Sequence, residues 1–290
     1  SSTHAFTIVV DDDVTAAEGK AIALSTNATT VDFSAAGVID TFANLASSGA
    51  ASANMAAIRG KDTNVNVSVS DVIGTASSVN VTDLNALRAV TTGVVTATIN
   101  GDAAELDDLA TAGSDLLAIT VNDAQSGSAG VTAVNTILSA TAGTVVASIS
   151  GTAAELASLT STASDDGTST LAITVSNAAK AAEGAAIVAS TNATTVDFSA
   201  GGVTDTFSNL TTGSGAVSTN MAAIRGKDTN VNVTVSGTIA DADTANVADL
   251  NALVAAAGGT VTATIDGNAA VLATVTASGS NATHAFTIVV

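Results

Sequence analysis

The sequence predicts a right-handed parallel α/β solenoid with uncapped ends, in which about one strand and one helix recur every 28 residues. Three observations predict this fold. The eight residues Thr3–Val10 recur unchanged, 280 residues later, as Thr283–Val290. Short segments in which apolar and small polar residues alternate are found throughout, and this period of two indicates half-buried strands. The segments between them carry Ala and Leu at helical spacing.

We expect ten strands in each period, and the segment Phe286–Val290 then opens the next period. The expected strands are Phe6–Val10, Thr30–Ser34, Val65–Ser70, Val95–Asn100, Leu117–Asn122, Val145–Ser150, Leu171–Ser176, Thr195–Ser199, Val231–Ser236 and Val261–Asp266. Consecutive strands joined by a helical crossover should be parallel and right-handed. Stacking such repeats gives a solenoid in which each repeat contacts only its neighbours.

Alternation along the strands assigns an inward and an outward face. Val95, Ala97 and Ile99 should face the helices, as should Val261 and its alternate neighbours. Helical spacing places further leucines on the covering helices: Leu84, Leu87, Leu106, Leu109, Leu156, Leu159, Leu250 and Leu253. Polar residues such as Asp71, Asp123 and Asn177 follow the strands, and we expect them to turn the chain and to cap the helix that follows.

Longer identities divide the chain into modules of a single continuous solenoid spanning residues 1–290. Thr26–Ala35 recurs as Thr191–Ala200, and Asn54–Val67 recurs as Asn220–Val233. The predicted modules contain four strands, two strands, four strands and the start of the next period. They span residues 5–115, 116–169, 170–280 and 281–290.

Two strand-turn-helix segments carry a family resemblance. Ser150–Leu159 (SGTAAELASL) and Leu171–Ala179 (LAITVSNAA) resemble the Ala/Thr/Val-rich tandem repeats of very long secreted bacterial surface proteins, cyanobacterial ones among them. They are also loosely similar to leucine-rich repeats in length and in strand-plus-helix plan. The resemblance implies an extracellular or cell-surface location and a structural or adhesive role.

Composition excludes several classes of function. Seven basic residues against 26 acidic ones give a net charge of −19, which disfavours nucleic acid and anionic membranes as partners. No apolar run is long enough for membrane insertion. The chain has no cysteine, two histidines and no recognisable catalytic constellation, so we expect neither an enzyme nor a bound cofactor.

Neither end of the sequence has the character of a capping repeat, so we expect self-association or covalent continuation. The chain begins without Met or a signal peptide and stops within a strand, which favours a window cut from a longer tandem polypeptide. Stacking of separate subunits is the alternative, and the recurrence of one strand at both ends favours the covalent form. The predicted end-to-end contact residues are Phe6, Ile8, Val10, Phe286, Ile288 and Val290.

Two further sites are candidates. Asp11, Asp12 and Asp13 could hold calcium through hard oxygen ligands, or could form a solvated turn that caps the helix starting near Val14. The outward face could bind a glycan or ice, could pack against a neighbouring fibre, or could be an ordinary solvated surface. Its predicted residues are Thr96, Thr98, Asn100, Thr262, Thr264, Ser68 and Thr234.

The leading hypothesis is therefore an extracellular or cell-surface structural protein that forms a rod or filament. The alternative is a binding module, such as an adhesin or a glycan- or ice-binding protein, that uses the Ser/Thr/Asn strand face. A polysaccharide-acting enzyme on a solenoid scaffold would need a cleft with clustered Arg, Lys or aromatic residues, which the sequence does not provide.

Overall fold

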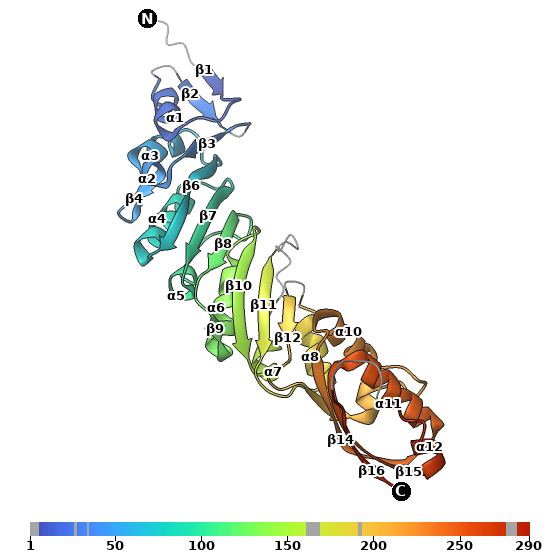
Figure 1. Cartoon of the computed structure of the whole chain (residues 1–290). Helices are drawn as coiled ribbons and strands as arrows, with labels where there is room; N and C mark the ends of the chain where they lie inside the picture. The colour runs from blue at the N-terminus through green and yellow to red at the C-terminus, as the bar shows by residue number, and fades with distance from the viewer. Residues whose placement is uncertain (1–5, 26–27, 34, 161–168, 191–192, 277–282) are drawn as a thin grey trace, which may run out of the picture. The chain divides into compact units, whose positions relative to one another are not determined.

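The computed structural model describes residues 6–25, 28–33, 35–160, 169–190, 193–276 and 283–290 (Figure 1). The first copy of the recurring segment therefore lies partly outside the described residues, as does part of the predicted module 116–169. The chain forms two compact units. They comprise residues 1–124, 133–147 and 161–170, and residues 125–132, 148–160 and 171–290. Both units belong to the mixed α/β class.

The first unit contains short strands that alternate with short helices. Its strands are β1 (Phe6–Val9), β2 (Ala28–Asp32), β3 (Gly37–Asp40), β4 (Ala46–Ser47), β5 (Ala50–Ala51), β6 (Asn66–Ala76), β7 (Val95–Gly101) and β8 (Leu116–Val121). Its helices are α1 (Ala16–Ala23), α2 (Phe42–Leu45), α3 (Ala53–Arg59), α4 (Ser78–Ala89) and α5 (Ala103–Leu106). Helix α6 (Gly127–Ser139) and strand β10 (Val145–Gly151) contribute residues to both units.

The second unit repeats this alternation. Its strands are β9 (Gln125–Ser126), β11 (Thr170–Val175), β12 (Ala193–Asp197), β13 (Val203–Thr206), β14 (Val231–Ala242), β15 (Gly258–Gly267) and β16 (Ala285–Val289). Its helices are α7 (Ala153–Leu156), α8 (Ala181–Val188), α9 (Phe207–Leu210), α10 (Thr219–Lys227), α11 (Thr244–Ala257) and α12 (Ala269–Leu272).

The main sheets are parallel and follow chain order. In the first unit β1 pairs with β2, and a second sheet runs β3-β6-β7-β8-β10. In the second unit the orders are β10-β11-β12 and β13-β14-β15-β16. Among the strands of the described residues, only the short pair β4–β5 is antiparallel. Within each parallel sheet the strands thus lie in chain order, with β4, β5 and β9 outside the sequence of neighbours, as expected for crossovers between parallel strands.

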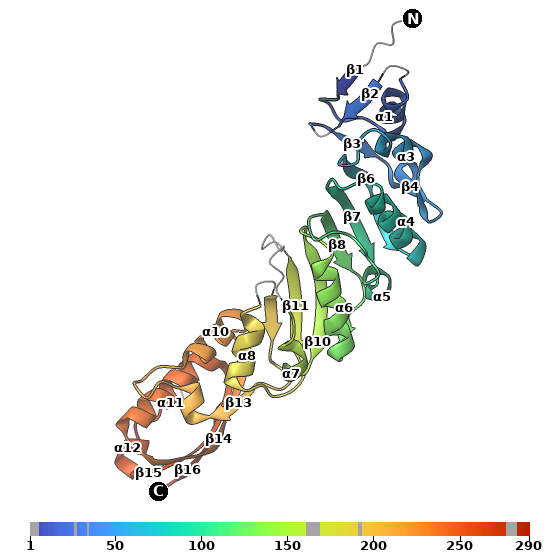
Figure 2. The ribbon, with the colours of Figure 1, turned by 180° about the vertical axis from the view of Figure 1, so that it is seen from behind.

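The predicted inward face forms the core. Val95, Ala97 and Ile99 are buried, and so are Val261, Ala263 and Ile265 in the second unit. Helices cover this face in the first unit, as the front and back views show (Figures 1 and 2). The helical leucines Leu84, Leu87, Leu250 and Leu253 are fully buried. Close packing of small strand residues against Leu-bearing helices makes a thin core without many aromatics.

One strand shortly after each copy of the identical segment, Thr26–Ala35 or Thr191–Ala200, was not expected from the sequence. Strand β3 follows β2 after a gap of only a few residues, and β13 follows β12 in the same way. At each place one sheet ends and another begins. A buried phenylalanine, Phe33 or Phe198, marks the change, and its N–H donates to a carboxylate 29 or 30 residues later, Asp62 or Asp228.

The repeats differ in length. We call a strand, with the segment that leads to the next strand, one repeat. Hydrogen bonds between neighbouring repeats join residues 20 apart at Val95 and Asp115, and 28 apart at Val94 and Asn66. A repeat of about 28 residues is therefore an average over unequal repeats. Strands β6 and β14 also extend beyond their expected ends through register shifts that interrupt the alternation.

Candidate functional site

The recurring eight-residue segment forms a strand at both of its positions, and each copy is paired along one edge. Strand β1 pairs with β2, the strand that follows it, with Ile8 opposite Val31. Strand β16 pairs with β15, the strand that precedes it, with Ile288 opposite Ile265. Within the described part of the chain neither strand pairs along its other edge. Each copy thus exposes the backbone edge that its counterpart uses.

The predicted end-to-end residues are largely exposed. Phe6 and Ile288 are 53% and 52% exposed, and Val290 is exposed as well. Ile8 and Phe286 are half-buried, whereas Val10 is buried within its own unit. The ring of Phe286 stacks on that of His284, with 5.9 Å between centroids. Exposed apolar side chains beside an unpaired strand edge are typical of a surface that pairs with another strand.

Carboxylates link each repeat to the one before it. The N–H of Ala103 donates to Oδ1 of Asp123 at 2.8 Å, and the N–H of Phe42 donates to Asp71 at 2.7 Å. In these bonds the carboxylate belongs to the later repeat and the N–H to the earlier one. The aspartates that act in this way are Asp40, Asp62, Asp71, Asp83, Asp115, Asp123, Asp205, Asp228 and Asp249.

These bonds correct the expectation that strand-exit residues cap the helix that follows them. Asp71 and Asp123 bind the helix of the preceding repeat, and Asn177 does the same for Ala153 at 2.8 Å. The prediction named the wrong helix as the partner of these residues. The sequence alone shows only which residues are close along the chain. In the structure, an acceptor that lies 20 to 29 residues later in the chain binds the N–H at the start of the helix.

The acidic triplet Asp11–Asp13 is exposed. Helix α1 is capped without it, because Thr15 and Glu18 form a capping box and the N–H of Ala16 donates to Asp40. Among the residues that the structure describes, no group of three or more His, Cys, Asp or Glu side chains converges to hold a metal ion. Calcium binding at this triplet stays a prediction.

The outward strand face is polar but interrupted. Thr98, Thr234 and Thr262 are exposed, whereas Ser68, Thr96, Asn100 and Thr264 are half-buried. Register brings several of them side by side: Ser68 with Thr96, Thr234 with Thr262, and Thr264 with Thr287. The exposed apolar side chains of Val72, Leu116 and Val146 interrupt the rows in the first unit, because Val72 lies opposite Thr98 and Leu116 lies opposite Thr96.

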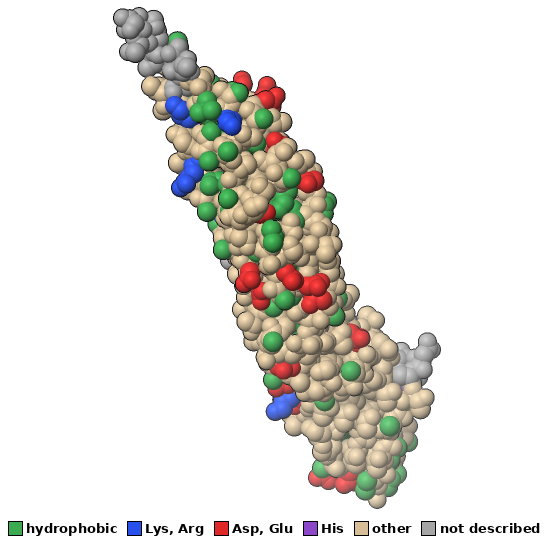
Figure 3. All heavy atoms as spheres, turned by 90° about the vertical axis from the view of Figure 1, so that its left-hand side faces the viewer, with side chains coloured by type: hydrophobic (Ala, Val, Ile, Leu, Met, Phe, Trp, Pro, Cys, Tyr) green, Lys and Arg blue, Asp and Glu red, His purple; other side chains and the backbone are tan. Residues whose placement is uncertain are grey.

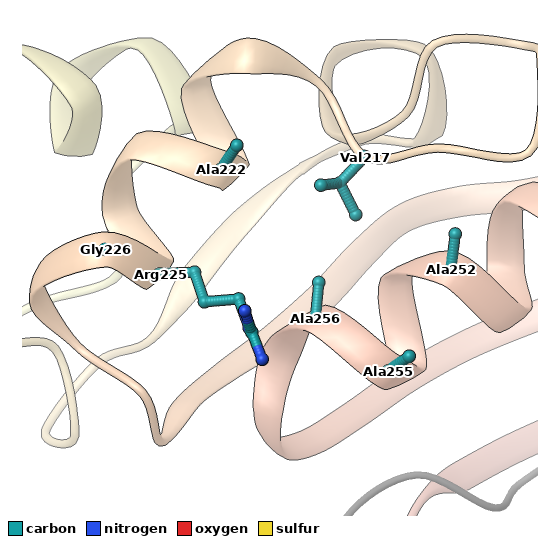
Figure 4. A pocket seen from close by; sticks show the side chains of 7 residues that line it. All are labelled: Val217, Ala222, Arg225, Gly226, Ala252, Ala255 and Ala256. Carbon is teal, nitrogen blue, oxygen red and sulfur yellow. The ribbon is translucent and has the colours of Figure 1, made fainter.

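A hollow of about 500 Å³ lies beside helices α10 and α11 (Figure 4). It is lined by Val217, Ala222, Arg225, Gly226, Ala252, Ala255 and Ala256. Arg225 is the one ionisable residue among these lining residues, and its side chain extends between the two helices. The hollow therefore offers no pair of groups for acid–base catalysis.

Charges are unevenly distributed on the surface. On the face drawn in Figure 3, basic side chains are few and separate, whereas acidic side chains form groups. The first unit contains the buried ion pair of Arg88 and Asp115, whose Nε and Oδ2 atoms are 3.0 Å apart. Because the basic side chains on this face are few and separate, they form no basic patch that could bind a polyanion.

Comparison with family models, with curated proteins and with solved structures finds no match to this chain. Among the described residues, no helix has the length and apolar character required to cross a membrane.

The carboxylate bonds predict an acid-dependent stability. Burial raises the pKa of Asp205, but hydrogen bonds from Asn209, Thr206 and Ala181, with the charge of Lys180, outweigh it and hold the pKa below the usual 3.8. A lowered folded-state pKa stabilises the protein fully above pH 3.8, and this contribution is lost as the pH falls through the lowered value. We expect Asp205→Asn to destabilise the second unit by about 1–2 kcal/mol at neutral pH, with a smaller difference from the wild type at low pH. Urea unfolding between pH 2.5 and 6 measures this, and a difference that does not change with pH would contradict it.

Proposed function

We propose that this chain is one period of a longer parallel α/β solenoid, a structural protein that builds a rod or filament by continuation from β16 into β1. One observation carries the proposal. Among the described residues, the copy at β16 pairs only with the strand before it, and the copy at β1 pairs only with the strand after it. If β16 of one period and β1 of the next are the same strand, that strand is paired along both edges, as strands in the interior of a sheet are.

Strand order supports the same conclusion. The sheet β13-β14-β15-β16 has the same plan as β3-β6-β7-β8, because β16 pairs with β15 through Ala263 and Phe286 as β8 pairs with β7 through Ala97 and Leu117. The longer sheet of the first unit continues beyond β8, whereas the described part of the chain provides no further strand beyond β16. A following copy would supply β2 as the next strand.

Covalent continuation accounts for the recurrence better than the stacking of separate chains. In a stack, β16 of one chain and β1 of the next would both be present, although the sheet needs only one of them. In a tandem polypeptide the segment Thr283–Val290 serves as both. The proposed setting is extracellular or at the cell surface, in line with the Ala/Thr/Val-rich composition of the repeats, and the net charge of −19 would keep neighbouring rods apart at low salt.

A two-copy chain tests the proposal. Residues 1–290 are joined directly to residues 11–290, so that one copy of the recurring strand lies at the junction. We expect the backbone amides of Thr283–Val290 of the first copy to exchange more slowly with solvent than in the single chain. Junction amides that exchange as they do in the single chain would contradict continuation.

A binding module is the second candidate, and one observation favours it. In the second unit Thr238, Thr264 and Thr287 lie opposite one another on three neighbouring strands, which gives a row of hydroxyl groups about 4.8 Å apart. Regular rows of this kind could hold a glycan or ice. Thermal hysteresis and glycan-array binding of the purified chain test this reading, and an absence of both would end it.

A further inference from the structure

An apolar groove on the first unit has a covered counterpart in the second. The groove is lined by Ile8, Val9, Val10, Asp11, Ala21, Ile22 and Ser25. The identity of Thr26–Ala35 with Thr191–Ala200 places Ile8 and Ile22 in register with Ile173 and Ile187, 165 residues later. Ile173 and Ile187 are each 1% exposed, whereas Ile8 and Ile22 are only half-buried. Within the second unit, β10 and helix α7 lie next to β11 and α8. The groove thus lacks the layer that β10 and α7 provide for its counterpart.

The segment that corresponds to β10 and α7 is present at the other end of the chain. Residues 266–272 (DGNAAVL) follow the pattern of residues 150–156 (SGTAAEL) and 100–106 (NGDAAEL). Ala153 and Ala103 are 1% and 2% exposed, whereas Ala269, at the same place in the pattern, is exposed. Among the described residues, the groove lacks the covering layer that its counterpart has, and the N–H of Ala269 lacks the partner that its counterparts have. The two places have matching positions in the repeat.

Two hydrogen bonds within the chain show which polar contact accompanies this packing of one repeat on the next. The N–H of Ala153 donates to Asn177, and the N–H of Ala103 donates to Asp123, both at 2.8 Å. The residue that corresponds to Asn177 in the first unit is Asp12. Within the described residues Asp12 accepts no hydrogen bond, and the N–H of Ala269 donates none.

Charge also distinguishes this pair of surfaces. Residues 101–110 carry the acidic side chains Asp102, Glu105, Asp107 and Asp108, whereas the corresponding residues 267–276 carry no charged side chain. The acidic side chains of residues 101–110 would repel a triplet of aspartates, whereas residues 267–276 would not. The acidic triplet therefore fits residues 267–276, which follow Asp266, better than it would fit residues 101–110.

We propose that the groove of β1 and α1 is the docking surface for residues 258–276 of a second, preceding copy of this chain, and that Asp12 accepts a hydrogen bond from the N–H of Ala269 of that copy. This inference rests on the proposed continuation of the solenoid. It gives the acidic triplet a role as a junction contact, in which Asp12 follows the shared strand by two positions.

The two-copy chain described above tests the contact through the exchange of one amide. We expect the Ala269 amide of the first copy to exchange at least about tenfold more slowly than in the single chain. Asp12→Ala in the second copy should return it toward the single-chain rate, while Asp12→Asn should keep it slow, because Asn177 makes the same bond. Asp12→Ala in the first copy, where no repeat precedes it, is the matched control and should leave the rate unchanged.

The outcomes separate this inference from the proposed function. If the amides of Thr283–Val290 gain no protection in the two-copy chain, the continuation itself fails. If those amides are protected but Asp12→Ala in the second copy leaves the Ala269 amide slow, only the Asp12 contact is overturned. Equal loss of protection in the Asp12→Ala and Asp12→Asn variants would also overturn it, since the amide side chain retains an acceptor.

Discussion

Replacing Phe198 by alanine is expected to lower the unfolding free energy of the second unit by about 3–5 kcal/mol. Phe198 is fully buried where β12 ends and β13 begins, and it is among the largest fully buried side chains of the protein. Its removal would leave a cavity at the point where two sheets meet. The backbone cannot close it easily, because the N–H of Phe198 is held by Asp228 at 2.9 Å.

Urea unfolding followed by circular dichroism measures this effect. Phe33→Ala repeats the change at the identical position of the first unit and should have a similar effect. Phe207→Ala is the control, since Phe207 is only half-buried and should cost far less. A loss below about 1 kcal/mol in Phe198→Ala would show that the site relaxes to fill the cavity.

Asp115→Ala is expected to be as damaging to the first unit, at about 3–5 kcal/mol. The carboxylate of Asp115 is fully buried, pairs with Arg88, and accepts the N–H groups of Val95 and Ala112, each at 2.9 Å. Alanine would leave a largely buried guanidinium without its counter-charge and two backbone donors without an acceptor. Removing one partner of a buried pair in this way is costly, whatever the pair itself contributes.

Asp115→Asn separates the lost charge from the lost acceptor. The amide oxygen can still accept one N–H, so this variant should be destabilised less than Asp115→Ala. Equilibrium unfolding of both variants under the same conditions gives the comparison. Equal stability of Asp115→Ala and the wild type would contradict the role of this carboxylate as a link between its own repeat and the repeat before it.

The sequence predicted the parallel α/β class and the buried faces because strands and helices leave different periods in the chain. The alternation at Val95, Ala97 and Ile99 corresponds to the burial of these three side chains. The strands β3 and β13 were missed, because four-residue segments that follow a turn closely carry too few positions to show a period.

The contacts between repeats could not be predicted from spacing alone. Asp123 reaches Ala103 across 20 residues, whereas Asp228 reaches Phe198 across 30. The separation depends on the length of each repeat, which the alternating pattern does not fix. The triplet Asp11–Asp13 was for this reason interpreted through local chemistry, as a calcium site or a helix cap. The offset of 165 residues aligns Asp12 with Asn177, but only the structure shows that Asn177 accepts the N–H of Ala153.

The carboxylate bonds between repeats are directional, and this gives the protein two chemically different poles. At each aspartate that links two repeats, the carboxylate oxygen comes from the later repeat and the N–H from the earlier one. For these aspartate bonds, one side of a repeat supplies the carboxylate and the other side supplies the N–H. A contact between two copies that reused these bonds would therefore join unlike surfaces, head to tail, as in a heterologous interface.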